Sequence, residues 1–320
     1  MSTARETGAA LDEAQALDAV QTGIRAALAA APWPSALTTV ATDVLASPAR
    51  ALGGRLTPWM LSPLGCCAAV CGDWTPALPS AVAAELYVTA LDLCDDIEDG
   101  DFSVPIDRYG VSVVLNLATA LLALAHVVLA PVGETSLSDA SRRAQDALWT
   151  GLAVATGGQH LDLVAAGADP LPVDDCLDIA RRKGGALVEA CCRAGAAFAT
   201  DNGTLIDLLG QFGRSVGLAA QLDNDMHDAD DGARKSDVAR RKQTVPIAMA
   251  RAHGEEALNG AVWQGGIQFA YALMHAERVR AGEALRLAAA ACPDPALAHT
   301  ALGSILKPRG PVPPSTTTTF

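Results

Sequence analysis

Aromatic residues are scarce in this chain, at 4% of 320 residues, and the 23 Lys and Arg are outnumbered by 36 Asp and Glu. The formal net charge of −13 argues against a nucleic-acid-binding protein, because such proteins need clustered cations to displace counterions from phosphates. The same shortage argues against a polybasic membrane-binding surface. No stretch alternates apolar and polar residues as a strand would, whereas Ala and Leu favour helix. We therefore predict an all-α fold.

The cysteines show no pattern typical of a disulfide framework or of a zinc site. The eight cysteines include two adjacent pairs, Cys66-Cys67 and Cys191-Cys192, inside apolar segments, and neither a CxxC motif nor a Cys–His spacing that suits zinc occurs. We expect small core residues rather than disulfide partners. Residues 1–15 lack a basic region followed by an apolar run, so no signal peptide is expected. These features predict a cytoplasmic protein.

One apolar run, residues 111–130, is about long enough to span a bilayer. It carries Asn116, Thr119 and His126 and has no basic flanks, so we expect a fully buried central helix and no transmembrane segment. Short Pro and Gly breaks elsewhere leave no long linker, which predicts one helical domain over residues 13–307. Residues 1–12 and 308–320 have the composition of disordered tails.

Two acidic stretches stand out against this background. In LDLCDDIEDGD, residues 91–101, the offsets i, i+3, i+4 and i+7 place four acids on one helical face: Asp92, Asp95, Asp96 and Asp99. The same offsets recur in residues 219–232, at Gln221, Asn224, Asp225 and Asp228. For either stretch alone, a solvated charged face at the end of a helix is an equal alternative. Because apolar runs precede both, the pair fits Mg²⁺, which takes one or two carboxylates and completes its octahedron with substrate phosphates.

These motifs resemble those of the trans-isoprenyl diphosphate synthases, the polyprenyl synthetase family of the class I isoprenoid synthase superfamily. Residues 95–99 match the family's DDxxD motif, and residues 221–228 match QxxDDxxD with Asn224 replacing one Asp. Residues 158–163 match GQxxDL, whereas residues 183–187 resemble KTGxL and residues 242–246 resemble a later K…TxP element. All occur in the family's order, from about residue 53 to residue 246.

The resemblance implies a helical bundle around a deep apolar cavity, with a Mg²⁺ cluster of about three ions at its mouth. The implied metal ligands are Asp95, Asp96, Asp99, Asn224, Asp225 and Asp228. The implied substrate contacts include Arg55, Gln159, Asp162, Lys183, Gln221, Arg234 and Lys235. An allylic prenyl diphosphate and a second copy of the chain, as a homodimer, are the expected partners.

The isopentenyl diphosphate site departs from the family pattern. The family's GKRxRP motif aligns with residues 53–58, where Arg55 is kept but Gly54 and Thr57 replace a lysine and an arginine. The arginine pair that usually follows the first acidic motif is missing, and only Arg108 stands nearby, in an unmatched place. Each charge-assisted contact contributes about 1.5–3 kcal/mol. We therefore expect isopentenyl diphosphate to be a poor co-substrate.

Three reactions are compatible with two intact acidic motifs and a degraded isopentenyl diphosphate site, which would bind the acceptor. Our first expectation is a terpene cyclase, in which the ionised allylic diphosphate is captured by its own alkenes. The alternatives are chain elongation and transfer to a non-isopentenyl acceptor, with a non-catalytic subunit a more distant fourth. The scarcity of aromatics that stabilise carbocations weighs against cyclisation.

Residues one and two turns before the first motif predict the substrate's length. The resemblance places Tyr87, Ala90 and Leu91 in the cavity wall, where Ala90 is small and Leu91 moderate. Burial of a longer tail is favoured by about 0.8 kcal/mol per CH₂, so we predict a C15 or C20 allylic substrate over C10. Asp92 stands where the family usually has an apolar residue. We expect it to hydrogen-bond within the bundle, with a role in positioning water or accepting a carbocation's proton as the alternative.

Overall fold

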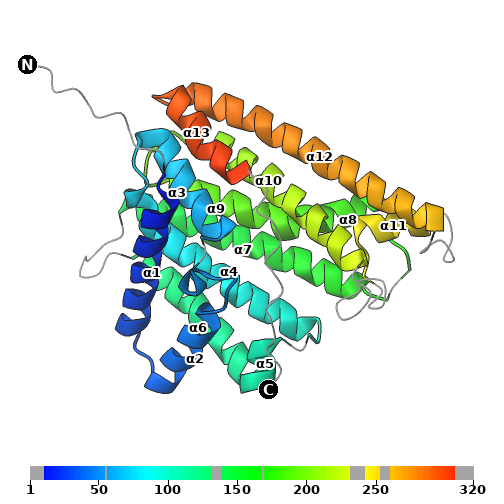
Figure 1. Ribbon diagram of the computed structural model, residues 1–320, viewed down its shortest axis with the longest axis horizontal. Coiled ribbons are helices and arrows are strands. Elements are labelled where there is room, and N and C mark those ends of the chain that lie inside the picture. Colours follow the sequence, from blue (N-terminus) through cyan, green and yellow to red (C-terminus); the bar gives the residue numbers. More distant parts are fainter. Residues whose placement is uncertain are drawn as a thin grey trace, which may run out of the picture. The chain divides into compact units, whose positions relative to one another are not determined.

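A computed structural model describes residues 11–54, 56–101, 103–130, 138–167, 169–230, 242–252 and 260–306. Every regular element within these ranges is a helix, which confirms the all-α prediction (Figure 1). By its internal contacts the chain divides into two compact units. The first unit comprises Met1–Gln145, Ala194–Asp201 and Cys292–Phe320, and the second comprises Asp146–Arg193 and Asn202–Ala291. The predicted tails lie almost entirely outside the described residues, and the domain limits at 13 and 307 stay a prediction.

Helix α4 (Leu78–Glu98) forms the core of the first unit. Its residues from Ser80 to Ala90 are all buried, as expected of a stretch in which Glu85 is the single charged residue. Helices α1 (Glu13–Ala30), α3 (Pro58–Cys71) and α6 (Val111–Val128) pack against it. The remaining helices of this unit are α2 (Ser35–Leu45), α5 (Val104–Tyr109), α13 (Pro295–Leu306) and the short 3₁₀ turns η1 (Ala51–Gly53) and η2 (Thr75–Ala77). This packing buries the middle of α4 and leaves its last turns, which include Asp92 and Glu98, open to solvent.

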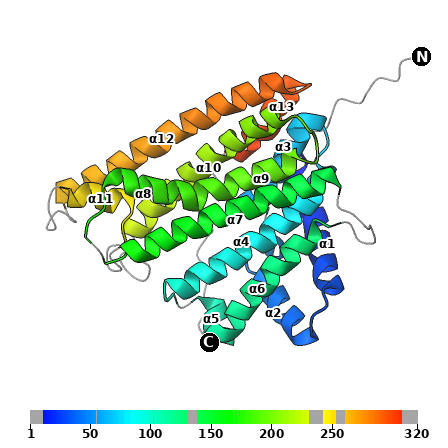
Figure 2. The same cartoon turned by 180° about the vertical axis from the view of Figure 1, so that it is seen from behind.

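Helix α6 contradicts the prediction of a fully buried central helix. One face, including Leu117 and Leu121, is buried where α6 runs beside α4 (Figures 1 and 2). The other face exposes Val113, Leu115 and Val127 to 43%, 49% and 58%. By length and composition alone, α6 and residues 75–98 are both apolar enough to cross a membrane, but 33% of the α6 window is buried against 72% for the other. The prediction was wrong because hydropathy shows that α6 is apolar but not which of its faces packs against another helix.

The second unit is built on two long helices, α10 (Gly203–Asp230) and α12 (Gly260–Ala291), which lie side by side in both views (Figures 1 and 2). Leu218 and Leu222 of α10 share a buried cluster with Ala270 and Met274 of α12. Helices α8 (Val173–Ala180) and α11 (Val245–Arg251) close one side of this cluster. Helices α7 (Asp139–Ala165) and α9 (Ala186–Ala196) belong mainly to this unit and extend into the first. Their packing fixes α10, which carries the second acidic motif.

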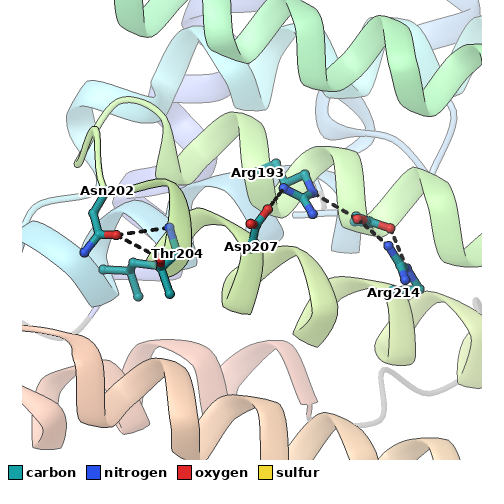
Figure 3. Close-up of polar contacts among 7 residues, drawn as sticks. Arg193, Asn202, Thr204, Asp207 and Arg214 are labelled. Carbon is teal, nitrogen blue, oxygen red and sulfur yellow. Dashed lines mark hydrogen bonds and ion pairs between the residues drawn. The ribbon is translucent and has the colours of Figure 1, made fainter.

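An ion-pair network ties α9 to α10 (Figure 3). The Glu189 carboxylate accepts hydrogen bonds from Arg193 Nε at 2.9 Å and from Arg214 Nε and Nη2 at 2.6 and 2.8 Å. Arg193 also donates from Nη1 to Asp207 Oδ1 at 2.6 Å. A bidentate Arg–carboxylate pair within a network contributes more to stability than an isolated ion pair on the surface. The network therefore holds the start of α10 against α9.

Candidate active site

The first acidic motif lies at the carboxyl end of α4. Asp95 and Asp96 are in its last turn, and Asp99 caps it, with its N–H donating to Asp95 O at 2.8 Å. The chain then turns at Gly100, whose φ of 69° favours glycine. The three carboxylates are half-buried, and α4 has no basic residue in its last turn. Because the helix dipole makes a carboxyl end negative, this placement disfavours anions and calls for cations.

The second motif repeats this arrangement at the carboxyl end of α10. Asp225 is 7% exposed and accepts a hydrogen bond from Gln221 Nε2 at 2.9 Å. Burial raises the pKa of Asp225 to about 6, although the Gln221 hydrogen bond and the Lys183 charge oppose the shift. Asp228 is half-buried, whereas Asn224 is exposed. A buried carboxylate at the negative end of a helix again implies a cation when it is ionised.

Two lysines lie beside Asp162, close to the second motif. Lys183 Nζ donates to Asp162 Oδ2 at 2.7 Å, and Lys242 Nζ lies 3.9 Å from the same oxygen. Asp162 is only 6% exposed, so the pair is well shielded from solvent. The sequence predicted Lys183 as a diphosphate contact and Asp162 as a cavity residue. The structure adds that Asp162 holds and orients Lys183.

A close backbone approach brings Lys183 to α10. Lys183 lies in η3 (Arg181–Gly185), a π-helical segment that joins α8 to α9. A Cβ at Gly217 of α10 would lie 2.3 Å from the Gly184 carbonyl oxygen, and a Cβ at Gly184 would lie 2.8 Å from Gln221 Cβ. Only glycines permit this approach. Gly184, in the KTGxL-like residues 183–187, and Gly217 therefore allow Lys183 to lie near the second motif.

Gln159, which the sequence predicted as a cavity residue, is a half-buried side chain with unmet hydrogen-bonding capacity. Both Nε2 and Oε1 are buried without a hydrogen-bond partner among the described residues. Buried amides are normally satisfied, so an unsatisfied one calls for a water or a ligand. Gln159 belongs to α7, in the same unit as Asp162 and Gln221, which favours its assignment as a substrate contact.

The donor atoms of both motifs fit Mg²⁺. In the described part of the chain, no three His, Cys, Asp or Glu side chains converge as a complete metal site. All six predicted ligands offer oxygen only, which is the preference of hard cations rather than of zinc. Mg²⁺ binds through few protein carboxylates and completes its shell with water and phosphate, so an incomplete protein site is the expected form. The buried Asp225 supports the fit because its ionised form needs a nearby cation.

Three of the predicted contacts, Arg55, Arg234 and Lys235, fall outside the described residues. Of the predicted cavity wall, Tyr87 and Ala90 are buried at 2% and 0% exposure and Leu91 is partly buried. Asp92 forms an ion pair with Arg50 of the first unit, which confirms that it bonds within the bundle.

The sequence reasoning missed Glu85, a fully buried acid of α4 that lies within ion-pair distance of Arg50. The available signal was a single charge inside an otherwise uncharged apolar run, residues 81–90, which needs a partner. Because Arg50 also pairs with Asp92, two acids of α4 share one cation.

A family model described as polyprenyl synthetase matches residues 51–264 of the chain. The chain is 32% identical over 195 residues to a geranylgeranyl diphosphate synthase from Mycobacterium tuberculosis, covering 57% of this chain and 55% of that protein. It is 32% identical over 190 residues to the farnesyl diphosphate synthase of Escherichia coli, covering 55% and 62%. A tryptophan prenyltransferase, ComQ of Bacillus spizizenii, is 27% identical over 169 residues, covering 52% and 56%. The matched part thus spans little more than half the length of these relatives.

Solved structures share the fold over nearly the whole chain. A polyprenyl synthetase from Streptomyces coelicolor matches with a TM-score of 0.75 and 23% identity, covering 91% of this chain and 96% of that one. A polyprenyl synthase from Caulobacter crescentus, complexed with calcium and isoprenyl diphosphate, matches with a TM-score of 0.59 and 20% identity, covering 95% and 99%. At these identities the likeness establishes the fold, the all-α isoprenoid synthase fold expected from the sequence.

Proposed function

Because this chain belongs to the polyprenyl synthetase family, we propose that it is a Mg²⁺-dependent prenyltransferase acting on an allylic prenyl diphosphate. The observation that carries the proposal is the pair of oxygen-only motifs, each at the negative carboxyl end of a helix. The complex of the Caulobacter protein with calcium and isoprenyl diphosphate supports a divalent cation and a diphosphate ligand. In the proposed reaction the allylic C–O bond breaks and diphosphate leaves with the bonding electrons. The acceptor then supplies electrons for the new bond and loses a proton to the released diphosphate or to water.

The residues of this chain have separate roles in that reaction. Bound Mg²⁺ would neutralise the diphosphate and stabilise it as a leaving group. Lys183, oriented by Asp162, would bind diphosphate oxygens, as would Arg234 and Lys235. Gln159 offers an unsatisfied amide to the substrate. The apolar tail would lie along Tyr87, Ala90 and Leu91.

Among the three candidate reactions, the names of the relatives favour prenyl transfer over the terpene cyclase expected first. By the comparisons, chain elongation is the leading form of transfer, because the two relatives that are each 32% identical over part of the chain are prenyl diphosphate synthases. Transfer to another acceptor is the second candidate. Gly54 and Thr57 in the acceptor motif favour it, as does the tryptophan prenyltransferase among the relatives.

Product analysis tests the proposal. Purified protein is incubated with Mg²⁺ and geranyl, farnesyl or geranylgeranyl diphosphate, with and without isopentenyl diphosphate. A prenyl diphosphate one unit longer supports elongation, and a prenylated product formed only with a small aromatic acceptor supports the second candidate. A hydrocarbon formed from the allylic substrate alone would contradict prenyl transfer and restore the cyclase.

Ala90→Phe is expected to shift substrate preference towards shorter allylic diphosphates. Ala90 is fully buried one turn before the first motif, so a phenyl ring there would fill space that a longer tail occupies. The measurement is kcat/KM for the C10, C15 and C20 substrates, with Phe expected to lower the C20 to C10 ratio about tenfold. As a matched control, Ala26→Phe at an exposed position of α1 should leave the ratio unchanged. A preference of the unmutated protein for the C10 substrate over both longer ones would contradict the predicted C15 or C20 substrate.

We also propose a cytoplasmic homodimer that uses the exposed face of α6. This face exposes Val113, Leu115 and Val127, yet also carries Asn116 and His126, which suit a protein contact better than lipid tails. The eight cysteines are free thiols, as expected in a reducing compartment. Leu115→Glu should convert the dimer to a monomer in light scattering, whereas Glu98→Lys, on an exposed position of α4, should not. A monomeric unmutated protein would contradict the proposal.

A further inference from the structure

A buried arginine near the first acidic motif is shared by two carboxylates. Arg50 Nη1 lies 3.7 Å from Glu85 Oε1, and Arg50 Nη2 donates to Asp92 Oδ2. The Arg50 side chain is 13% exposed, Glu85 is fully buried, and the Asp92 side chain is 56% exposed. Asp92 is therefore the solvent-facing member of the group.

The same group includes one of the two substituted positions of the acceptor motif. Thr57, which stands where the family has an arginine, is 4% exposed and donates from Oγ1 to Glu85 Oε2 at 2.9 Å. At the other position, Gly54 has a φ of 90°, and a Cβ there would meet nothing within 4 Å. Arg50 thus provides a cation close to the position where Thr57 replaces one.

Arg50 lies close enough to the first metal motif to influence which acceptor binds there. Arg50 also interacts electrostatically with Asp96, a member of the first metal motif. Asp92 is one helical turn before Asp95 and Asp96 on the same face of α4. If the first motif holds the allylic diphosphate as proposed, an acceptor would approach the allylic carbon beside it. It would therefore meet the exposed oxygens of Asp92 rather than the guanidinium of Arg50.

We propose that Asp92 determines acceptor specificity by engaging Arg50, so that this side of the site disfavours a second diphosphate and takes an acceptor that lacks one. The inference rests on the proposed prenyl transfer, and it favours the second candidate, transfer to an acceptor without a diphosphate, over chain elongation. Two carboxylates surround one guanidinium, so the group as a whole does not offer a positive charge to an incoming anion. The exposed Asp92 oxygens instead suit an acceptor that carries an N–H or O–H donor.

Asp92→Asn tests the proposal because it removes the competing charge while keeping the side chain's shape. Isopentenyl diphosphate is titrated into the protein by calorimetry without divalent metal and without allylic substrate, so that the metal motifs cannot hold it. We expect Asp92→Asn to bind isopentenyl diphosphate about tenfold more tightly than the unmutated protein, since one charge-assisted contact becomes available. The matched control is Asp43→Asn. Asp43 pairs with Arg108 in the same unit, at 2.8 Å through both carboxylate oxygens, and its loss changes the net charge equally.

A double variant assigns the gain to Arg50. Asp92→Asn combined with Arg50→Gln should return affinity to the unmutated level, and thermal melting checks that the double variant is folded. If it does not fold, the comparison of Asp92→Asn with Asp43→Asn decides. Unchanged or weaker binding by Asp92→Asn, or equal tightening by Asp43→Asn, overturns the inference. Binding is read without turnover, so an absence of prenyl transfer in every variant would contradict the proposed function separately.

Discussion

Asp95→Ala or Asp225→Ala should lower the rate of allylic diphosphate turnover at least about 100-fold. Each substitution removes a proposed oxygen ligand from a motif at the negative end of its helix, where a cation and the leaving diphosphate would otherwise compensate each other. Asp225 carries the stronger expectation because it is 7% exposed and its pKa is raised to about 6 by burial. The measurement is steady-state release of diphosphate at saturating Mg²⁺.

Matched acidic residues on the same helices provide the controls. Glu98 is exposed on α4, and Asp223 lies on α10 outside the residues that share the motif face. Glu98→Ala and Asp223→Ala should therefore retain most of the unmutated rate. A rate above about one tenth of normal in Asp95→Ala or Asp225→Ala would contradict the role assigned to that residue.

Gly217→Ala should lower the free energy of unfolding by about 2–4 kcal/mol. A methyl group at this position would lie 2.3 Å from the Gly184 carbonyl oxygen and 2.9 Å from Val188 Cγ2, so α10 or η3 must move. The movement would also displace Lys183 from Gln221, so the rate should fall with stability. Chemical denaturation followed by circular dichroism gives the free energy.

Gly265→Ala, in α12, is the control for this prediction. A Cβ there would meet nothing within 4 Å, so alanine should be neutral or stabilise the helix by about 0.5–1 kcal/mol. Equal stability of the two variants would show that the close approach of Gly184 and Gly217 does not constrain the fold.

Helix-forming composition was enough to predict the fold class, and the offsets within each acidic motif predicted two polar helical faces. The candidate ligands on those faces followed from the resemblance to the family's motifs. Both acidic motifs do lie on helices, and Ala90 is buried, while its place in a cavity wall stays a prediction. These features are local, because residues three and four apart share a face of a helix whatever surrounds it.

Features that depend on contacts distant in sequence could not be predicted. The exposed face of α6 depends on which helices cover it, and hydropathy does not record that. In the sequence, Thr57 in place of an arginine indicated only the loss of a cation from the isopentenyl diphosphate site. The structure shows that Thr57 bonds Glu85 and that Arg50, 35 residues earlier in the chain than Glu85, shares the same carboxylate. Likewise, the lysine motif was visible in the sequence, but the reason for its glycines is the approach of α10.

The most direct test of the account is the metal dependence of allylic diphosphate ionisation. Purified protein is mixed with farnesyl or geranylgeranyl diphosphate, and release of diphosphate is followed with Mg²⁺, after addition of excess chelator, and after Mg²⁺ is restored. We expect turnover with Mg²⁺, loss of at least about 99% of the rate in chelator, and recovery when the metal returns. Near-normal release of diphosphate in excess chelator would contradict it.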